Sequence, residues 1–379
     1  MIEPIVNFFV RVFQWIGRGI GFVIGIILWP FLWLAGWYTR RGWILKLVVG
    51  ALLLGLVALY GNFFYATQFW KNFNPNYPDT LSFAVPPAQK PADIQDTSQT
   101  IEGGEGEIRT CTRSAVVDVA ADLIDFNVNQ NAWISSMILY KIGFFGIDWD
   151  NTPFMDNKAS FQRGVNQAIR RTSIELVDTI GRVRGTSQID RDLQDARGSI
   201  TFDEETWYFG LQPFGPKTPT PSFYRVARNK LISFNNRLEK CEVVFNARSD
   251  NLLQLVDRIA SDIGSTSDLI RDRSQNNNSG WFDTRADDRF WFAYGQLYGF
   301  YGIMRAVRHD FQQVFQSRGL EPLEDNLEQQ FKSALRIQPL IISNGSEDGW
   351  IMPTHLTTMG FYVLRVRSAL VEMRSVLDR

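Results

Sequence analysis

The chain has 379 residues, of which 45% are hydrophobic and 14% aromatic, and its 39 Lys and Arg nearly balance its 40 Asp and Glu. This length and apolar content allow a large core and exclude a disordered chain. The near-neutral charge argues against a nucleic-acid-binding protein, which needs a concentrated excess of basic residues. Two histidines and two cysteines are too few for a Cys/His metal cluster or a multi-disulfide scaffold, so we expect no metal and no cofactor.

Charge is divided unevenly along the chain. Residues 1–72 carry six basic side chains and one acid, for a net charge of +5, and the remainder carries a net charge of −6. A basic, apolar head on an acidic body is the composition of a membrane anchor joined to a water-soluble domain.

Residues 44–66 form the clearest apolar segment, with Lys46 as its single charge. At 1.5 Å per residue, such a helix covers roughly 34 Å, enough for a hydrocarbon core of about 30 Å. Trp43 and Trp70 lie at its two ends, where amphipathic rings prefer the membrane interface. The segment predicts a transmembrane helix.

A second apolar segment, residues 20–38, is uncharged but contains Pro30, which removes a helix hydrogen bond. It predicts a second span, a re-entrant hairpin or helices in the membrane interface. Gly17, Gly21 and Gly25 recur every four residues, a spacing that favours close packing between membrane helices and so self-association; the alternative is that these glycines only loosen an interfacial segment. The region does not resemble a cleaved signal peptide, because no short basic leader precedes it.

The basic residues also predict topology. Arg40, Arg41 and Lys46 come directly before or at the start of the clear span, whereas only Lys71 follows it closely. The positive-inside rule places residues 40–46 in the cytoplasm and everything after residue 70 outside, whether the chain crosses once or twice. In a Gram-negative bacterium this is an inner-membrane protein with a periplasmic C-terminal domain.

Residues 73–110 predict a tether, and residues 111–379 a helical domain. The tether contains five prolines in its first half and EGGEGE at 102–107, with no helical periodicity. Part of it is alternatively an ordered extended segment on the domain surface.

From Cys111 onward, apolar residues recur at helical spacing and sustained β-like alternation is absent. The longest pattern alternates four and three residues and predicts one helix over 221–263, about 60 Å long, with an interruption at the RSDN stretch, residues 248–251, as the alternative. Further helices are predicted through 290–315 and after Pro353, with Thr354 as a cap. These patterns predict an all-α, elongated helical bundle with long heptad-patterned helices. The residues of the longest pattern are Phe234, Leu238, Cys241, Phe245, Arg248, Leu252, Leu255 and Ile259.

The predicted helix 290–315 carries a stripe of small residues. Interior glycine costs about 1 kcal/mol relative to alanine, so some interaction should offset that cost. Close helix packing is the simpler explanation; a ligand lying on the stripe beside aromatic side chains is the other. The stripe consists of Gly295, Gly299, Gly302 and Ala306.

Four segments carry a resemblance to a known family. They are LIDFNVNQNAWISSM, FDEETWYFG, DDRFWFAYGQLYGFYGIMRAVRHDF and LIISNGSEDGWIMPTH, in this order. In arrangement and segments, from about residue 40 to the C-terminus, the chain resembles bacterial inner-membrane proteins known only as a conserved domain of unknown function. The resemblance implies one membrane helix before a large envelope domain, and it implies no activity and no site residues. The apolar segment 20–38 departs from that pattern.

The two cysteines, Cys111 and Cys241, predict a disulfide if the domain lies outside the membrane, with two buried free thiols as the alternative. His309 and His355 are expected to be structural, because HExxH and CxxC motifs are absent from the sequence. No GxSxG turn or dinucleotide fingerprint occurs either, so no catalytic or cofactor-binding residue is predicted.

Two groups of carboxylates lie beside aromatic residues, as a glycosidase or a glycan-binding module would require. Acidic residues also begin helices for electrostatic reasons, so a structural role is the alternative. We expect an interaction or scaffolding protein that self-associates or serves as a subunit of a membrane complex, with a peptidoglycan hydrolase or glycan-binding module as the alternative. The carboxylates are Asp203, Glu204 and Glu205 near Trp207 and Tyr208, and Asp283, Asp287 and Asp288 near Trp281, Trp291 and Phe292.

Overall fold

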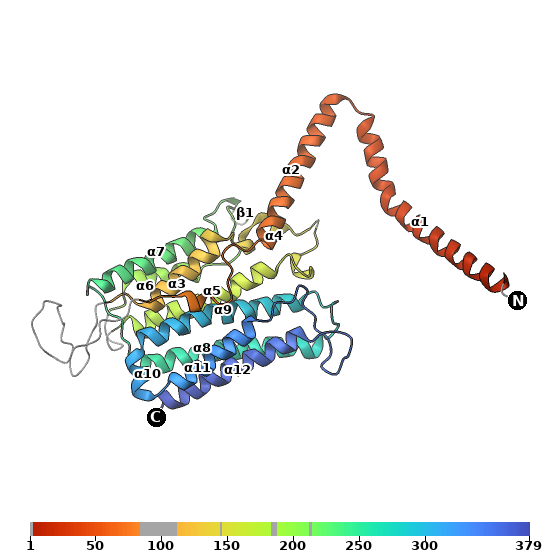
Figure 1. Ribbon diagram of the computed structural model, residues 1–379. Helices are drawn as coiled ribbons and strands as arrows, with labels where there is room; N and C mark the ends of the chain where they lie inside the picture. The colour runs from red at the N-terminus through yellow and green to blue at the C-terminus, as the bar shows by residue number, and fades with distance from the viewer. Residues whose placement is uncertain (1–2, 84–111, 145, 183–187, 212–213) are drawn as a thin grey trace, which may run out of the picture. The chain divides into compact units, whose positions relative to one another are not determined.

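Figure 1 shows a computed structural model of the chain, which describes residues 3–83, 112–144, 146–182, 188–211 and 214–379. These ranges are mostly helical, which confirms the all-α prediction. Their only sheet is an antiparallel hairpin of two three-residue strands, in which Phe209 pairs with Pro216. The chain divides into two compact units, Met1–Phe63 and Phe64–Arg379, the second of which we call the C-terminal domain.

The elements follow one another as α1 (Glu3–Thr39), α2 (Trp43–Gln68), α3 (Ala115–Asp125), α4 (Ile138–Ile142), α5 (Asn157–Glu175), α6 (Arg191–Ile200), β1 (Phe209–Leu211), β2 (Phe214–Pro216), α7 (Thr220–Glu239), α8 (Ser249–Asn276), α9 (Ala286–Asp310), α10 (Gln312–Arg318), α11 (Glu321–Leu335) and α12 (His355–Leu377). A short 3₁₀ turn, Tyr77–Thr80, precedes α3.

The N-terminal unit holds α1 and most of α2. Of the helices that the structure describes, α2 alone is long and apolar enough to cross a membrane as a single helix. Pro30 lies inside α1, whose segments Gly17–Ile26 and Leu28–Thr39 meet at 43° and together are apolar enough for a second span. Gly17, Gly21 and Gly25 are exposed on α1, and a Cβ at each would meet no atom within 4 Å.

Helix α9 forms the centre of the C-terminal domain (Figure 1), where it packs against α3, α5, α8, α11 and α12. Every residue from Ala293 to Met304 is buried, so this helix contacts protein on all of its faces. A helix enclosed in this way is apolar all round instead of having one hydrophobic stripe.

Helices α5 and α9 are parallel and very closely packed. A Cβ at Gly295 would overlap the backbone carbonyl of Phe161, and a Cβ at Gly299 would lie 2.8 Å from Cβ of Ala168. Gly164 of α5 faces the backbone of α9 in the same way. The glycine stripe therefore lets the two backbones approach, and Gly302 at its far end lies against Tyr77.

The prediction of one continuous helix over 221–263 is wrong. Helix α7 ends at Glu239 and α8 begins at Ser249. Cys241 has φ of +62°, a left-handed conformation that ends a right-handed helix. Phe245 and Asn246 then contact Phe311 and the backbone of Ile180, respectively. The apolar spacing continues across this turn because the turn also faces the core.

Residues 73–83, the beginning of the predicted tether, pack against the core of the C-terminal domain together with Trp70, which precedes them. The side chains of Trp70, Phe73, Tyr77 and Phe83 lie against its core. Residues 84–110, the rest of the predicted tether, lie outside the described residues, as does Cys111 of the predicted disulfide.

Candidate functional site

The last turn of α2 is tied to the beginning of α5. The buried ammonium group of Lys158 donates hydrogen bonds to the carbonyls of Ala66 and Phe69, both at 2.8 Å. Burial, and to a lesser degree Lys71, lower the pKa of Lys158 to about 8, so this side chain is still mostly charged at neutral pH. A cation suits this place, because the final carbonyls of a helix lack partners and carry partial negative charge.

Further contacts extend this junction. Gln68 donates a hydrogen bond to the carbonyl of Phe154 at 2.8 Å, and the indole of Trp70 lies 4.9 Å from the ring of Phe161. The hydroxyl of Tyr77 donates to the carbonyl of Tyr298 on α9. The chain leaving α2 is therefore fixed to α5 and α9.

Replacing Lys158 by Met is expected to lower the free energy of unfolding by about 2 kcal/mol, because two helix-terminal carbonyls lose a charged donor. Hydrogen exchange of the full-length protein in detergent should also show faster exchange at residues 66–71. Lys141→Met, a change at an exposed lysine of α4, serves as the matched control. Equal exchange in both variants would contradict this role.

An acidic cluster lies at the N-terminal ends of α5 and α9. It consists of Asp150, Asp156, Asp287 and Asp288. One carboxylate oxygen from each of Asp150, Asp156 and Asp288 can be chosen so that all three lie within 4.8 Å of one another. The hydroxyl of Ser160 donates to Asp288 at 2.8 Å, and that of Tyr140 donates to Asp150 at 3.0 Å. The cluster joins the segment before α5 to the first turn of α9.

Two members of the acidic cluster are buried without a hydrogen-bond donor from outside the cluster. Asp156 is 0% exposed and Asp287 is 2% exposed, and neither side chain accepts a hydrogen bond from any described residue outside the acidic cluster. Burial and the neighbouring carboxylates raise the pKa values of Asp156 and Asp287 well above the ordinary range, and burial also raises that of Asp288. The carboxylate oxygens of Asp150, Asp156 and Asp288 could hold a metal ion. No metal site is predicted here from the sequence.

Comparison with protein families gives a match over residues 123–278 and 270–379 to a family described as an uncharacterized protein conserved in bacteria, DUF2333. The chain belongs to this family. Comparisons with curated proteins and with solved structures found no match. The matched residues include α5, α9 and all four residues of the acidic cluster, so the site lies within the domain that the family shares.

In this DUF2333 protein the carboxylates near Trp207 are held by arginines. Glu204 pairs with Arg170 at 2.9 Å and lies 3.6 Å from Arg163, and Glu205 pairs with Arg163 at 2.9 Å. Asp203 accepts a hydrogen bond from Thr206. These contacts connect α5 to the segment before the hairpin, which is a structural use of the predicted carboxylates.

Asp283 has different partners from Asp287 and Asp288, although the three are close in sequence. It forms a buried salt bridge with Arg273 of α8 and accepts a hydrogen bond from the side-chain amide of Asn344 at 2.7 Å. Asn344, itself fully buried, also donates to the carbonyl of Asn277 and pairs through its backbone with Gly280. This group joins the loop before α9 to the loop before α12.

Both histidines have contacts within the fold. His309 lies 3.0 Å from Asp310, whose carboxylate accepts hydrogen bonds from the first backbone amides of α3. His355 Nδ1 accepts a hydrogen bond from the backbone of Ser343. These contacts position the ends of α9 and α12.

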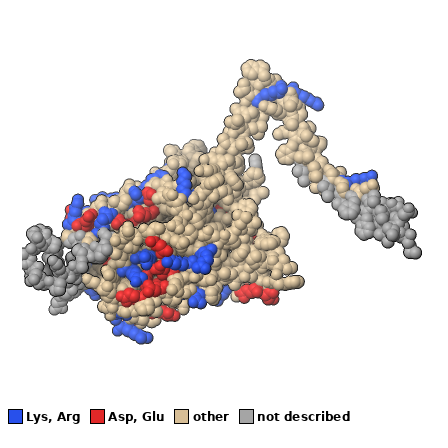
Figure 2. Space-filling model, in the orientation of Figure 1, with Lys and Arg blue, Asp and Glu red and all other residues tan. Residues whose placement is uncertain are grey.

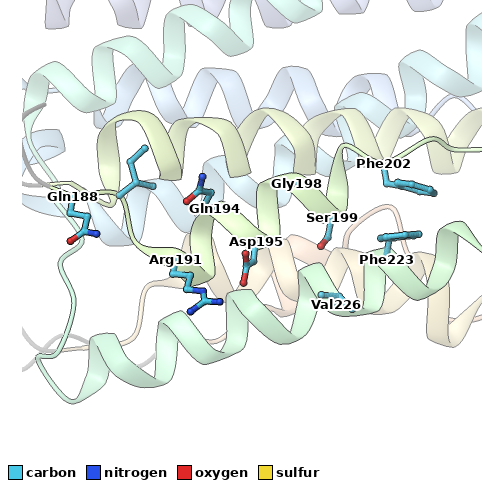
Figure 3. A pocket seen from close by; sticks show the side chains of 10 residues that line it. Gln188, Arg191, Gln194, Asp195, Gly198, Ser199, Phe202, Phe223 and Val226 are labelled. Atoms are coloured by element: carbon cyan, nitrogen blue, oxygen red, sulfur yellow. The ribbon is translucent and has the colours of Figure 1, made fainter. Parts of the chain in front are cut away.

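A surface pocket lies between α6 and α7, and Figure 3 shows its lining. Phe202 and Phe223 stack at one end with their ring centroids 3.7 Å apart. Asp195, the carboxylate in this lining, pairs with Lys230 at 2.9 Å. With its carboxylate already paired and its rings stacked on each other, this pocket gives less indication of chemistry than the acidic cluster.

One end of the C-terminal domain exposes large apolar side chains, and we call it the apolar end. Three segments form this end: residues 142–154, residues 281–282 and residues 340–351. The acidic cluster joins residues 150–156 to α9, and Asn344 joins the loop before α9 to the loop before α12. Phe282, Leu340 and Trp350 are 80%, 92% and 93% exposed. In Figure 2 the end of the C-terminal domain away from the grey segment is mostly uncharged, apart from an acidic group at its lower edge, whereas basic and acidic side chains gather in the middle of the visible face. The apolar end comprises Ile142, Phe144, Ile147, Phe154, Trp281, Phe282, Leu340, Ile341, Trp350 and Ile351.

Proposed function

We propose that this protein is a membrane-anchored, extracytoplasmic interaction or scaffolding protein of the bacterial envelope, whose C-terminal domain rests its apolar end on the outer surface of the inner membrane. In this proposal α2 spans the bilayer, and the basic residues Arg40, Arg41 and Lys46 keep the segment before it in the cytoplasm. The helical domain is then held at the periplasmic surface, where it self-associates or serves as an accessory subunit of a membrane complex.

The observation that carries this proposal is that the apolar end is also the end that receives the chain from α2. Gln68 donates a hydrogen bond to the carbonyl of Phe154, which belongs to the apolar end. Lys158, which binds the last turn of α2, comes two residues after Asp156 of the acidic cluster. The contacts of residues 66–77 with α5 and α9 limit how far this end can move from the point where the chain leaves α2.

The chemistry of the apolar end also fits a lipid surface. Contiguous exposed apolar patches are unusual on soluble surfaces and mark membrane or protein contacts. Aromatic rings such as Trp281 and Trp350 are favoured at the level of lipid headgroups. A chain that leaves the hydrocarbon at this same end places these side chains within reach of the bilayer, so we assign the bilayer as their partner.

Photo-crosslinking in lipid nanodiscs tests this assignment on the full-length protein. Substituting Phe282 or Trp350 by p-benzoylphenylalanine is expected to give lipid adducts on illumination, measured by mass spectrometry of the protein. The controls place the same group at Val226, which is 45% exposed on α7, and at Gln316, which is exposed on α10. We expect at least tenfold fewer lipid adducts at the two control positions.

The other outcomes distinguish the alternatives. Equal lipid labelling at all four positions would overturn docking on the bilayer. Adducts with a second copy of the chain or with another protein, in place of lipid, would make the apolar end a subunit interface.

A further inference from the structure

The carboxylate of Asp156 has an unusual environment for a residue that precedes a helix. At the equivalent place before α6, Asp190 accepts hydrogen bonds from the backbone amides of Asp192 and Leu193, which is the usual function of such a residue. Asp156 makes no such bond to the beginning of α5. Instead its fully buried carboxylate lies with those of Asp150 and Asp288.

The surroundings of the acidic cluster do not balance its charge. The parallel N-termini of α5 and α9 supply the equivalent of about half a positive charge each, against four carboxylates. Arg289 lies near Asp288, and Arg163 lies near Asp150 but is already paired with Glu204 and Glu205. A buried carboxylate is stable only when it is paired, protonated or bound to a metal.

We propose that Asp150, Asp156 and Asp288 bind one hard divalent cation of the Ca²⁺, Mg²⁺ or Mn²⁺ class between the beginnings of α5 and α9. All three donors are carboxylate oxygens, which these cations prefer, whereas zinc favours imidazole and thiolate ligands. The hydroxyls that bond to Asp150 and Asp288, from Tyr140 and Ser160, orient two of the three ligands. The fully buried oxygens of Asp156, which accept no hydrogen bond from any described residue outside the acidic cluster, are the ligands that the cation satisfies.

A cation in this place would join three parts of the domain. Asp150 belongs to the segment that carries Phe144, Ile147 and Phe154 of the apolar end, Asp156 directly precedes α5, and Asp288 is in the first turn of α9. The ion would therefore fix the apolar segment to the central helix pair. This inference does not depend on the membrane proposal.

The test uses the full-length protein in detergent, first stripped of metal with a chelator and then dialysed against Ca²⁺, Mg²⁺ or Mn²⁺ separately. Elemental analysis is expected to find one ion per chain for at least one of these metals. The same metal should raise the Tm by about 5 °C at a concentration about 100 times Kd. Asp156→Asn and Asp288→Asn should each abolish the bound ion and the gain in Tm.

Two further variants separate metal binding from general stability. Asp268→Asn changes an exposed carboxylate of α8 and should keep both the ion and the gain in Tm. Glu324→Gln changes a buried carboxylate paired with Arg308, so it should lower the Tm but keep the metal-dependent gain. A wild-type protein that binds none of the three metals, or Asn variants that bind as wild type does, would overturn the proposal. The first of these results would mean that the acidic cluster holds protons instead.

Discussion

Replacing Asp283 by Ala is expected to lower the free energy of unfolding of the C-terminal domain by about 3–5 kcal/mol, because it leaves a partly buried arginine without its partner. The side chain of Asp283 is 1% exposed, and Arg273 and Asn344 both depend on it. Loss of the carboxylate removes a salt bridge and a hydrogen bond at once. Denaturant unfolding of the full-length protein in detergent, followed by near-ultraviolet circular dichroism, measures the change.

The matched control is Asp250→Ala. Asp250 also pairs with an arginine, Arg248, at 3.0 Å, but its side chain is 62% exposed. Exposed pairs contribute little, so this change should cost at most about 1 kcal/mol. Equal losses for the two variants would show that burial of the Asp283 pair has no special importance.

The consequence of Asp283→Ala should also be local. Asp283 and Asn344 connect the loop that carries Trp281 and Phe282 to the loop that carries Leu340 and Trp350. Amide exchange in residues 277–285 and 340–354 should therefore accelerate more than exchange in α6 or α7. An even acceleration across the domain would instead indicate a purely global effect.

The sequence was sufficient for the class of fold and for the apolar segment of α2, because both depend on local composition. It also predicted α12 after Pro353, although Thr354 makes no side-chain cap bond. Spacing failed between Glu239 and Ser249, where turn residues such as Phe245 face the core and so imitate a helix face. Periodicity reports which residues are buried, and it cannot distinguish a buried turn from a buried helix.

The acidic cluster could not be predicted from local sequence, for a different reason. The sequence singles out Asp287 and Asp288 as candidates because they are carboxylates beside aromatic residues, with the acidic first turn of a helix as the structural alternative. Asp150 and Asp156 were missed, since nothing near them in sequence indicates that α5 lies parallel to α9. The one local signal is Asp156 directly before a helix, where an ordinary cap is the simpler interpretation. Only the packing of the two helices reveals that its carboxylate points elsewhere.

The close packing of α5 against α9 leads to the second prediction of a large loss in stability. Replacing Gly295 by Ala is expected to lower the free energy of unfolding by about 3 kcal/mol, although alanine is the better helix former. The new Cβ would overlap the backbone carbonyl of Phe161, and a backbone cannot turn aside as a flexible side chain can. To relieve the overlap, α5 and α9 must separate along their parallel contact.

Gly198→Ala is the control, because Gly198 lies inside α6 and a Cβ there would meet no atom within 4 Å. This change should raise the free energy of unfolding by about 0.5–1 kcal/mol, through helix propensity alone. The two substitutions are chemically identical, so opposite signs in denaturant unfolding would isolate the close approach of α5 and α9. A stabilising effect at both positions would mean that the two helices can move apart freely, and the geometry argued for the acidic cluster at their N-terminal ends would then lose its support.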